Sequence, residues 1–127
     1  MSKHNEVGKI GEGLAKEFLE KQGYEIIEQN YRTKYAEIDL IVKKGKDLVF
    51  VEVRTKIGEN FGTPEETINK KKMKKLWGNA IAYASIKKWD GSSRIDAICI
   101  VLKPLGRSPT GEANYSIERL NHYESII

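Results

Sequence analysis

The sequence contains a single cysteine, Cys99, and only three prolines in 127 residues. One cysteine excludes an internal disulfide, and its apolar neighbours in residues 95–101 predict a buried thiol in a strand of a protein from a reducing compartment. No apolar run approaches the roughly 20 residues that span a bilayer, and the first residues lack the apolar core of a secretory signal. We therefore expect a cytoplasmic protein without a membrane partner.

Several catalytic motifs are also missing. Gly8, Gly11 and Gly13 resemble a nucleotide-binding loop, but no predicted strand precedes them and no Gly-Lys-Ser/Thr follows. No serine lies in a nucleophile-elbow pattern, and the two histidines, His4 and His122, lie near opposite ends of the sequence. The sequence therefore offers no support for a Ser-His-Asp triad or for hydrolysis through a covalent intermediate.

The overall composition is that of a folded protein. Charged residues make up 31% of the chain and apolar residues 39%, which is ordinary for a globular protein. The length suits one core, so we expect residues 1–127 to form a single domain. The net charge of +4 favours polyanionic partners such as nucleic acids but does not identify one.

Hydrophobic periodicity and turn residues divide the chain into helices and strands. Helices are predicted at about residues 6–22 and 64–88, and strands at 24–31, 36–43, 48–55, 94–103 and 114–120. Pro64 occupies a favoured first helical position. The inward stripe of this second helix is predicted to be Ile68, Leu76, Trp77, Ala80, Ile81 and Ala84. The order α-β-β-β-α-β-β predicts an α/β fold with a mixed β-sheet and flanking helices.

A tight turn is predicted between the second and third strands, which we therefore expect to be antiparallel neighbours. If Gly45 and Lys46 are the turn residues, counting back along both strands places Asp39 opposite Glu52. Directly opposed side chains have Cβ atoms about 4.5–5.5 Å apart, so two carboxylates there repel each other unless a cation compensates. The hairpin thus predicts an acidic pair.

The same register places Glu37 opposite Arg54, on the same face of the hairpin as Asp39 and Glu52. Mg²⁺ prefers carboxylate, carbonyl and water oxygens, so two adjacent carboxylates and a substrate phosphate would make a magnesium site. The alternative is that both acids lie on a solvated face of the sheet. Single acids within nearly continuous apolar runs nevertheless indicate strands that are buried on both faces.

Lysines crowd the start of the second predicted helix. A solvated helix face is the ordinary explanation of such a cluster. A phosphate-contacting rim would instead use Lys70, Lys71, Lys74 and Lys75, together with Arg32 and Lys56. Lys72 is different because it lies four residues after Ile68 and four before Leu76, on the apolar stripe. We expect Lys72 to lean toward the carboxylates or a bound phosphate.

The hairpin residues resemble a known catalytic core. The segments Glu37-Ile38-Asp39-Leu40-Ile41 and Val49-Phe50-Val51-Glu52-Val53-Arg54 look like the Asp…Glu-x-Lys core of the restriction-endonuclease-like, or PD-(D/E)xK, nucleases. More narrowly, the whole chain resembles the YraN family of small, endonuclease-like bacterial proteins. The motifs that carry this resemblance run from Gly8-x-x-Gly11-Glu12-x-x-Ala15 through Gly23-Tyr24, Asn30-Tyr31-Arg32, Pro64 and Lys72 to Arg94-Ile95-Asp96.

This resemblance implies a restriction-endonuclease-like fold and a divalent metal held by Asp39, Glu52 and the backbone carbonyl of Val53. The order of Glu12, Asp39 and Glu52 is also similar to that in archaeal Holliday-junction resolvases, which carry a helical glutamate ahead of the core. Glu12 would then be an accessory acid. A glutamate favoured by the helix dipole is the structural alternative at that position.

One position departs from the family's pattern. The usual core lysine is Arg54 here, and a guanidinium that stays protonated can steady a phosphate but cannot act as a general base. Lys56 or Lys72 could take the lysine's role, or the reaction could need no base from the protein. The sequence also leaves open whether Asp96 joins the site or pairs with Arg94.

The leading hypothesis is a Mg²⁺- or Mn²⁺-dependent endonuclease that hydrolyses DNA, including branched or otherwise structured DNA, by direct attack of water on phosphorus. Asp39 and Glu52 would bind the metal, and Arg54 and Lys72 would stabilise the charge of the phosphate. The alternative is a nucleic-acid-binding module that keeps the nuclease fold without turnover, and a protein-interaction domain is a third hypothesis. Junction-like substrates would suit a two-fold homodimer.

Overall fold

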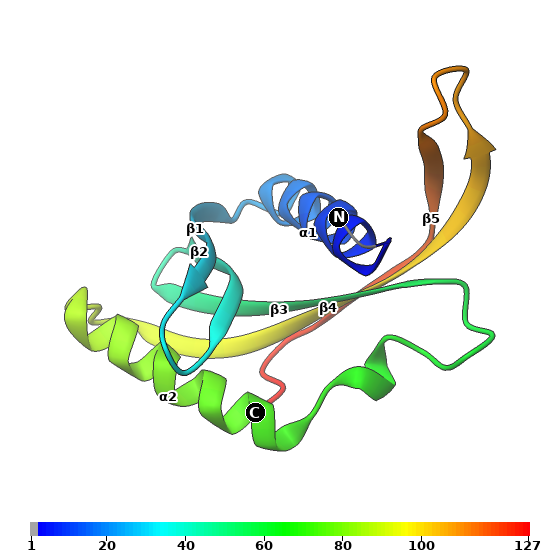
Figure 1. Cartoon of the computed structure of the whole chain (residues 1–127). Coiled ribbons are helices and arrows are strands. Elements are labelled where there is room, and N and C mark those ends of the chain that lie inside the picture. Colours follow the sequence, from blue (N-terminus) through cyan, green and yellow to red (C-terminus); the bar gives the residue numbers. More distant parts are fainter. Residues whose placement is uncertain (1–2) are drawn as a thin grey trace.

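The computed structural model describes residues 3–127, and the side chains from Glu6 onward. Its elements in chain order are α1 (Lys3–Lys21), β1 (Glu25–Arg32), β2 (Glu37–Lys44), β3 (Asp47–Ile57), the 3-10 helix η1 (Glu65–Thr67), α2 (Lys70–Ile86), β4 (Ser92–Arg107) and β5 (Ala113–Tyr123). Figure 1 shows the sheet between the two α-helices, with α1 on one face and α2 on the other. The predicted α/β class, with a mixed sheet and flanking helices, is confirmed.

The sheet has the strand order β1-β2-β3-β4-β5. Neighbouring strands are antiparallel except β3 and β4, which are parallel. Parallel strands need a crossover connection, and α2 provides it. The middle of the sheet is therefore covered on both faces, which explains why β3 and β4 are nearly continuous apolar runs.

The β2–β3 hairpin has the predicted register. Gly45 adopts a left-handed φ of +59° in the turn, a conformation that glycine takes without steric cost. From the turn the ladder runs to Leu40 opposite Val51, where it ends. The next position along the two strands carries Asp39 and Glu52, so these acids lie where β2 separates from β3.

Two apolar cores hold the helices on the sheet. On one face α1 buries Ala15 and Leu19 against β2, β3 and β4, and on the other face α2 buries Leu76 and its neighbours. Gly11 allows α1 to approach β3 closely, because a Cβ at this position would lie 1.8 Å from Thr55 Oγ1. The N-terminal half of α1 is therefore fixed beside the end of β3 that carries the candidate site.

The second helix begins later than the sequence predicted. Pro64 opens the single turn η1, and the chain then returns to an extended conformation at Ile68 (φ −75°, ψ 119°). Asn69 caps α2, and its side chain accepts hydrogen bonds from the N–H groups of Lys71 and Lys72. The predicted start at Pro64 was wrong because the fixed φ of proline suits the first turn of a 3-10 helix as well as that of an α-helix.

The inward face of α2 also differs in part from the prediction. Its buried residues are Met73, Leu76, Asn79, Ala80 and Tyr83. Ile81, which was predicted to face inward, is 48% exposed because it lies about 100° around the helix from Ala80. In the part of the chain that the structure describes, no helix is both long and apolar enough to cross a membrane.

Strands β4 and β5 are longer than predicted and continue past the sheet as a hairpin. Figure 1 shows this hairpin projecting from the rest of the molecule. Within the sheet, Cys99 of β4 is fully buried, as predicted, and burial raises the pKa of its thiol to about 12. The cysteine is therefore a core residue rather than a reactive one.

Asp96, also fully buried in β4, pairs structurally with Arg94 and with the end of the chain. Its Oδ1 accepts hydrogen bonds of 3.0 Å from Arg94 Nε and from the Ser125 N–H, and His122 Nε2 lies 2.7 Å from its Oδ2. Burial alone would raise the pKa of Asp96, but these hydrogen bonds outweigh burial and lower it. The network fastens β5 and the residues after it to the centre of the sheet.

Replacing Asp96 with alanine should lower the free energy of unfolding by about 3 kcal/mol at pH 7, because Arg94 would lose the carboxylate that compensates its partly buried charge. Urea denaturation measures this loss. Because folding lowers the pKa of Asp96, its stabilisation is present above the unfolded pKa of about 3.9 and disappears as the pH falls through the folded value. Asp90→Ala, at an exposed position, is the control and should change stability by less than about 0.5 kcal/mol. Equal stability of the two variants would contradict the role of Asp96.

Candidate metal centre

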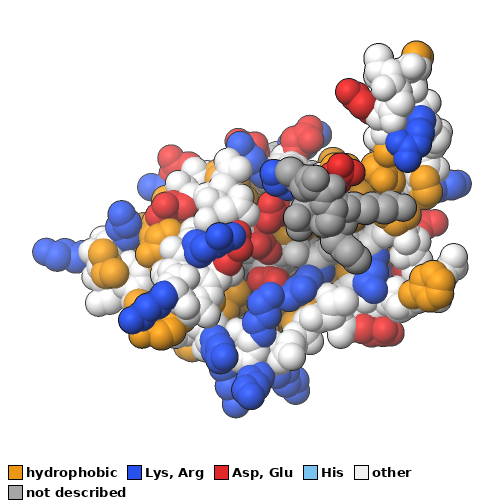
Figure 2. All heavy atoms as spheres, viewed as in Figure 1, with side chains coloured by type: hydrophobic (Ala, Val, Ile, Leu, Met, Phe, Trp, Pro, Cys, Tyr) orange, Lys and Arg blue, Asp and Glu red, His pale blue; other side chains and the backbone are white. Residues whose placement is uncertain are grey.

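Asp39 of β2 and Glu52 of β3 line one cleft of about 480 Å³ on the α2 side of the sheet. The walls of the cleft are completed by Tyr35, Ala36, Glu37, Asn69, Lys71, Lys72 and Lys75. Figure 2 shows acidic side chains gathered in the hollow in the middle of this face, with lysine and arginine side chains below them over α2. The hairpin thus brings together the two acids that the sequence paired.

Asp39 lies at the fork between β2 and β3. Its Oδ2 accepts a hydrogen bond of 2.8 Å from the Val53 N–H, two residues beyond the last ladder position on β3. In an extended strand the N–H and the C=O of one residue point to the same side. The Val53 carbonyl therefore points toward the same fork as the Asp39 carboxylate.

The environment of Asp39 is acidic. Burial and the charge of Glu52, with smaller contributions from Glu12 and Glu37, raise the pKa of Asp39 to about 8, although the hydrogen bond from Val53 opposes the shift. Among residues 6–127, no lysine, arginine or histidine lies within ion-pair distance of this carboxyl group. Asp39 therefore holds a proton at neutral pH unless a cation binds beside it.

Glu52 is more deeply buried than Asp39, with 3% of the residue exposed, but it has cationic partners. Its Oε1 lies 2.9 Å from Arg54 Nη2 and 3.7 Å from Lys72 Nζ. Burial still raises the pKa of Glu52, because the two cations offset it only in part. Lys72 leans toward the carboxylates as predicted, and the Asn69 cap explains its position by setting the start of α2 beside β3.

The predicted pairing of Glu37 with Arg54 is wrong. The β2–β3 ladder ends before it reaches these residues, and Glu37 instead pairs with Arg32 of β1, whose Nη2 lies 3.0 Å from the Glu37 carboxylate. Arg54 binds Glu52 on its own strand. Arg32, predicted to contact phosphate, is exposed and held at the edge of the cleft by Glu37.

The lysines of α2 divide between the cleft and its rim. Lys71 and Lys75 line the cleft with Lys72, whereas Lys70 and Lys74 are exposed on the same first turns of the helix. All five therefore lie at or near the mouth of the acidic cleft. Their placement agrees with the predicted rim and leaves their role as a prediction.

Glu12 and Lys56 lie around a neighbouring pocket of about 350 Å³, which they share with Arg54. Glu12 Oε1 accepts a hydrogen bond of 3.0 Å from Asn30 Nδ2, so this acid is oriented from α1 toward the fork. Arg54 Nε is buried and has no hydrogen-bond partner among the described residues. The guanidinium thus keeps a donor that its contact with Glu52 does not use.

Arg119 is a residue near the site that the sequence did not reveal. It donates to both carboxylate oxygens of Glu65, at 2.7 and 2.8 Å, and to Glu59 at 2.8 Å. The hydrogen bonds from Arg119 lower the pKa of Glu65 to about 2. We call these three residues the Arg119 clamp, which ties the segment between β3 and α2 to β5. The partners lie 54 and 60 residues apart in the chain, so no local pattern could indicate them.

The donor atoms of the cleft fit a hard divalent cation. Between residues 6 and 127, no three Asp, Glu, His or Cys side chains are grouped closely enough to hold a metal by themselves. Mg²⁺ commonly uses only one or two carboxylates and completes its shell with water and substrate oxygens, and Mn²⁺ takes the same ligands. Asp39, Glu52 and the Val53 carbonyl make such a set, and a cation there would supply the positive charge that Asp39 lacks.

Asp39→Asn should stabilise the metal-free protein at alkaline pH. The folded state keeps the Asp39 proton up to about pH 8, whereas the unfolded chain releases it near pH 4, so wild-type stability falls as the pH rises across this window. Asparagine has no such proton, so the free energy of unfolding of the variant should exceed that of the wild type by about 1 kcal/mol or more at pH 8. Thermal unfolding in a chelator from pH 5 to pH 9 measures the difference. A constant difference, or one no larger than that of the exposed control Asp90→Asn, would show that Asp39 ionises freely.

Comparison with known proteins assigns the chain to a family. Residues 11–100, which include Glu12, Asp39, Glu52 and Lys72, match the family described as "Uncharacterised protein family UPF0102". A UPF0102 protein of Syntrophus aciditrophicus is 36% identical over 107 residues, which cover 84% of each chain. One from Thermodesulfovibrio yellowstonii is 42% identical over 95 residues, which cover 75% of this chain and 85% of the relative.

A third relative extends the match over almost the whole chain. The UPF0102 protein of Clostridium botulinum is 35% identical over 122 residues, which cover 94% of each chain. The similarity therefore includes both helices and the central strands of the sheet. The resemblance to YraN proteins is confirmed, and the chain belongs to the uncharacterised protein family UPF0102.

Proposed function

We propose that this protein is a Mg²⁺- or Mn²⁺-dependent endonuclease with a restriction-endonuclease-like fold, acting on DNA. The observation that carries the proposal is Asp39, an acid at a strand fork that faces other carboxylates and has a pKa raised to about 8. An acid in this position is compensated best by a divalent cation. The lysines of α2 around the same cleft favour a polyanionic substrate.

In this proposal Asp39, Glu52 and the Val53 carbonyl hold the ion. A divalent ion in such a site would supply Lewis acidity and would lower the pKa of a water molecule beside it. The net reaction is hydrolysis: water attacks phosphorus, one P–O ester bond breaks, and a phosphate monoester and a hydroxyl group are the products. No covalent bond to the protein forms.

Arg54 and Lys72 supply the positive charge from the protein. Both lie beside Glu52, at 2.9 and 3.7 Å, so a phosphate bound at the cleft would meet two cations. Preorganised charges of this kind stabilise the charge that develops on phosphate oxygens in the transition state. A guanidinium does not serve as a general base, so the proposal gives Arg54 no part in proton transfer. Glu12, reaching the fork from α1, is the accessory acid of the proposal.

The topology supports the nuclease fold as part of the proposal. An acidic residue near the start of one strand and a second on the next strand of the same hairpin meet at a fork, and a helical crossover then brings cations to that fork. The similarity to archaeal resolvases in the order of Glu12, Asp39 and Glu52 favours branched or structured DNA. Such substrates would be matched by a homodimer with two clefts.

Asp39→Ala and Glu52→Gln should each reduce metal-dependent cleavage of DNA by about a hundredfold or more, because each removes a ligand of the ion. The assay uses plasmid, gapped and four-way-junction DNA in Mg²⁺ and in Mn²⁺, with Asp90→Ala as the control. Mn²⁺ binding, followed by the paramagnetic signal of the free ion, should weaken in parallel. Undiminished cleavage by the Asp39 variant on every substrate would overturn the assignment.

A DNA-binding module without turnover is the second candidate, and one observation favours it. Arg54 already compensates Glu52 at 2.9 Å, so one of the two metal-binding acids is engaged by the protein itself. Such a module would bind DNA with a steep dependence on salt and would cleave no substrate in either metal. The cleavage assay described above separates this candidate from the nuclease.

Replacing Lys70, Lys71, Lys74 and Lys75 together by glutamine should weaken DNA binding at every sequence. Each lysine that neutralises a phosphate contributes about one unit to the slope of log affinity against log salt, so the slope should fall by up to about four units. Fluorescence anisotropy in a chelator measures binding without cleavage. Lys87→Gln/Lys88→Gln, at exposed positions beyond the other end of α2, is the control. An unchanged slope would place the DNA elsewhere.

A further inference from the structure

Phe61 is the most exposed large apolar residue of the described chain, with 96% of its surface accessible. It lies in the loop between β3 and η1. Gly58 and Gly62 of this loop, on either side of Phe61, have left-handed φ values of +66° and +108°. The Arg119 clamp holds this loop on both sides, through Glu59 before Phe61 and Glu65 after it. The aromatic ring is therefore presented to solvent on a loop that is tied to the sheet.

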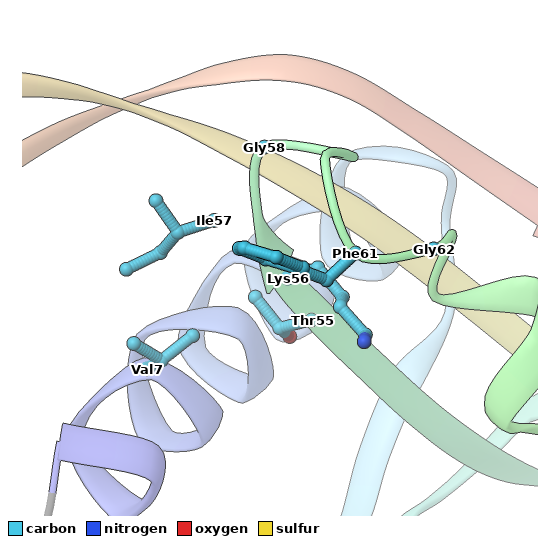
Figure 3. Close-up of a pocket in the computed structure, with 7 residues that line it drawn as sticks. All are labelled: Val7, Thr55, Lys56, Ile57, Gly58, Phe61 and Gly62. Carbon is cyan, nitrogen blue, oxygen red and sulfur yellow. The ribbon is translucent and has the colours of Figure 1, made fainter.

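Phe61 borders a pocket of about 430 Å³ at the end of β3. The pocket is lined by Val7, Thr55, Lys56, Ile57, Gly58, Phe61 and Gly62. Figure 3 shows Val7 and Ile57 on one side of this pocket and the Lys56 amine on the other, with Phe61 between them. The pocket thus combines an aromatic ring, two aliphatic side chains and a cation, a set that can take a flat apolar group linked to a negative charge.

This pocket adjoins the pocket of Glu12 and Arg54, two residues of the proposed function. Val7, Thr55 and Lys56 also line the neighbouring pocket that contains Glu12 and Arg54. Along an extended strand, Glu52 and Lys56 are separated by about 13 Å, at about 3.3 Å per residue. A stacked nucleic-acid strand advances about 3.4 Å per nucleotide, so about four nucleotides would connect the two sites.

We propose that Phe61 and the pocket beside it bind an unpaired nucleobase of the DNA strand whose backbone lies across Arg54 and Lys56. The inference deepens the proposed function, on which it rests, by naming the substrate class as DNA with unpaired nucleotides close to the cleaved bond. Every base has a π-face, so stacking on Phe61 selects an unstacked base and not a sequence. In an intact duplex the bases are stacked on one another and cannot reach the ring.

Two cations along the adjoining pockets favour an anionic occupant such as a nucleic-acid backbone. Lys56 lines the pocket with Phe61, Arg54 lines the adjoining pocket, and the nearby carboxylates of Glu59 and Glu65 are both bound by Arg119. Arg54 Nε is buried and has no hydrogen-bond partner within residues 6–127, so this guanidinium is not fully satisfied by the protein.

The test compares three DNA probes in a chelator, so that no cleavage occurs: a duplex, the same duplex with a short single-stranded gap, and the gapped duplex with abasic residues across the gap. Phe61→Ala should weaken binding of the gapped probe about tenfold and leave the duplex unchanged. Phe61→Trp should restore binding, because it keeps the stacking surface. Leu105→Ala, at a residue 62% exposed on the projecting hairpin, is the control and should change nothing.

The abasic probe gives the decisive comparison. It should bind the wild type about tenfold more weakly than the gapped probe does, and Phe61→Ala should weaken it no further, because the base that stacks on the ring is already missing. Equal losses on all three probes, or no loss on the gapped probe, would overturn the proposal. Conversion of a wild-type dimer to a monomer by Phe61→Ala in sedimentation experiments, with equal losses on every probe, would overturn it in favour of an interface between copies.

Failure of this inference and failure of the proposed function give different results. Selective loss of the gapped probe in Phe61→Ala, with no cleavage by the wild type in Mg²⁺ or Mn²⁺, would support the base pocket and refute the nuclease. Cleavage that Asp39→Ala abolishes, with no effect of Phe61→Ala on any probe, would support the nuclease and refute the pocket. A wild type that binds none of the probes would refute both.

Discussion

The carboxyl group of Asp39 is the constraint on which the candidate metal centre depends. The β2–β3 ladder ends at Leu40 and Val51. Beyond it, the Asp39 carboxylate accepts the hydrogen bond from the Val53 N–H that a backbone carbonyl of β2 would accept if the ladder continued. That hydrogen bond holds the acid beside Glu52, where burial and repulsion both oppose its ionisation. The fork of the hairpin therefore favours any ligand that brings positive charge to this point.

A comparison with Asp96 shows why Asp39 is proposed as a binding group and Asp96 is not. Asp96 is the more deeply buried acid, yet its pKa is lowered, because Arg94, His122 and a backbone N–H all bind its carboxylate. Asp39 has the Val53 N–H and acidic neighbours, and its pKa is raised. The protein surrounds the Asp96 carboxylate with cations and donors, whereas it gives Asp39 a single backbone N–H and acidic neighbours.

The segment between β3 and α2 connects the candidate metal centre with the pocket beside Phe61. It leaves β3 after the cationic positions Arg54 and Lys56, presents Phe61, and enters α2 where Asn69 sets Lys72 beside Glu52. The Arg119 clamp fixes this path to β5. The proposed metal ligands of β3, the proposed phosphate contacts and the proposed base pocket thus follow one another along β3 and the connection after it.

The sequence by itself determined the hairpin register and the acidic pair, because a tight turn and strict alternation fix which residues of two adjacent strands face each other. Its motifs also determined the family. It also placed Cys99 in the core and Lys72 near the acids. Only the tertiary structure decided where α2 begins, that Glu37 binds Arg32, and that Arg119 clamps the loop. These features depend on where strands diverge and on contacts between residues far apart in the chain. Periodicity in the sequence reports only local geometry, so it could not predict them.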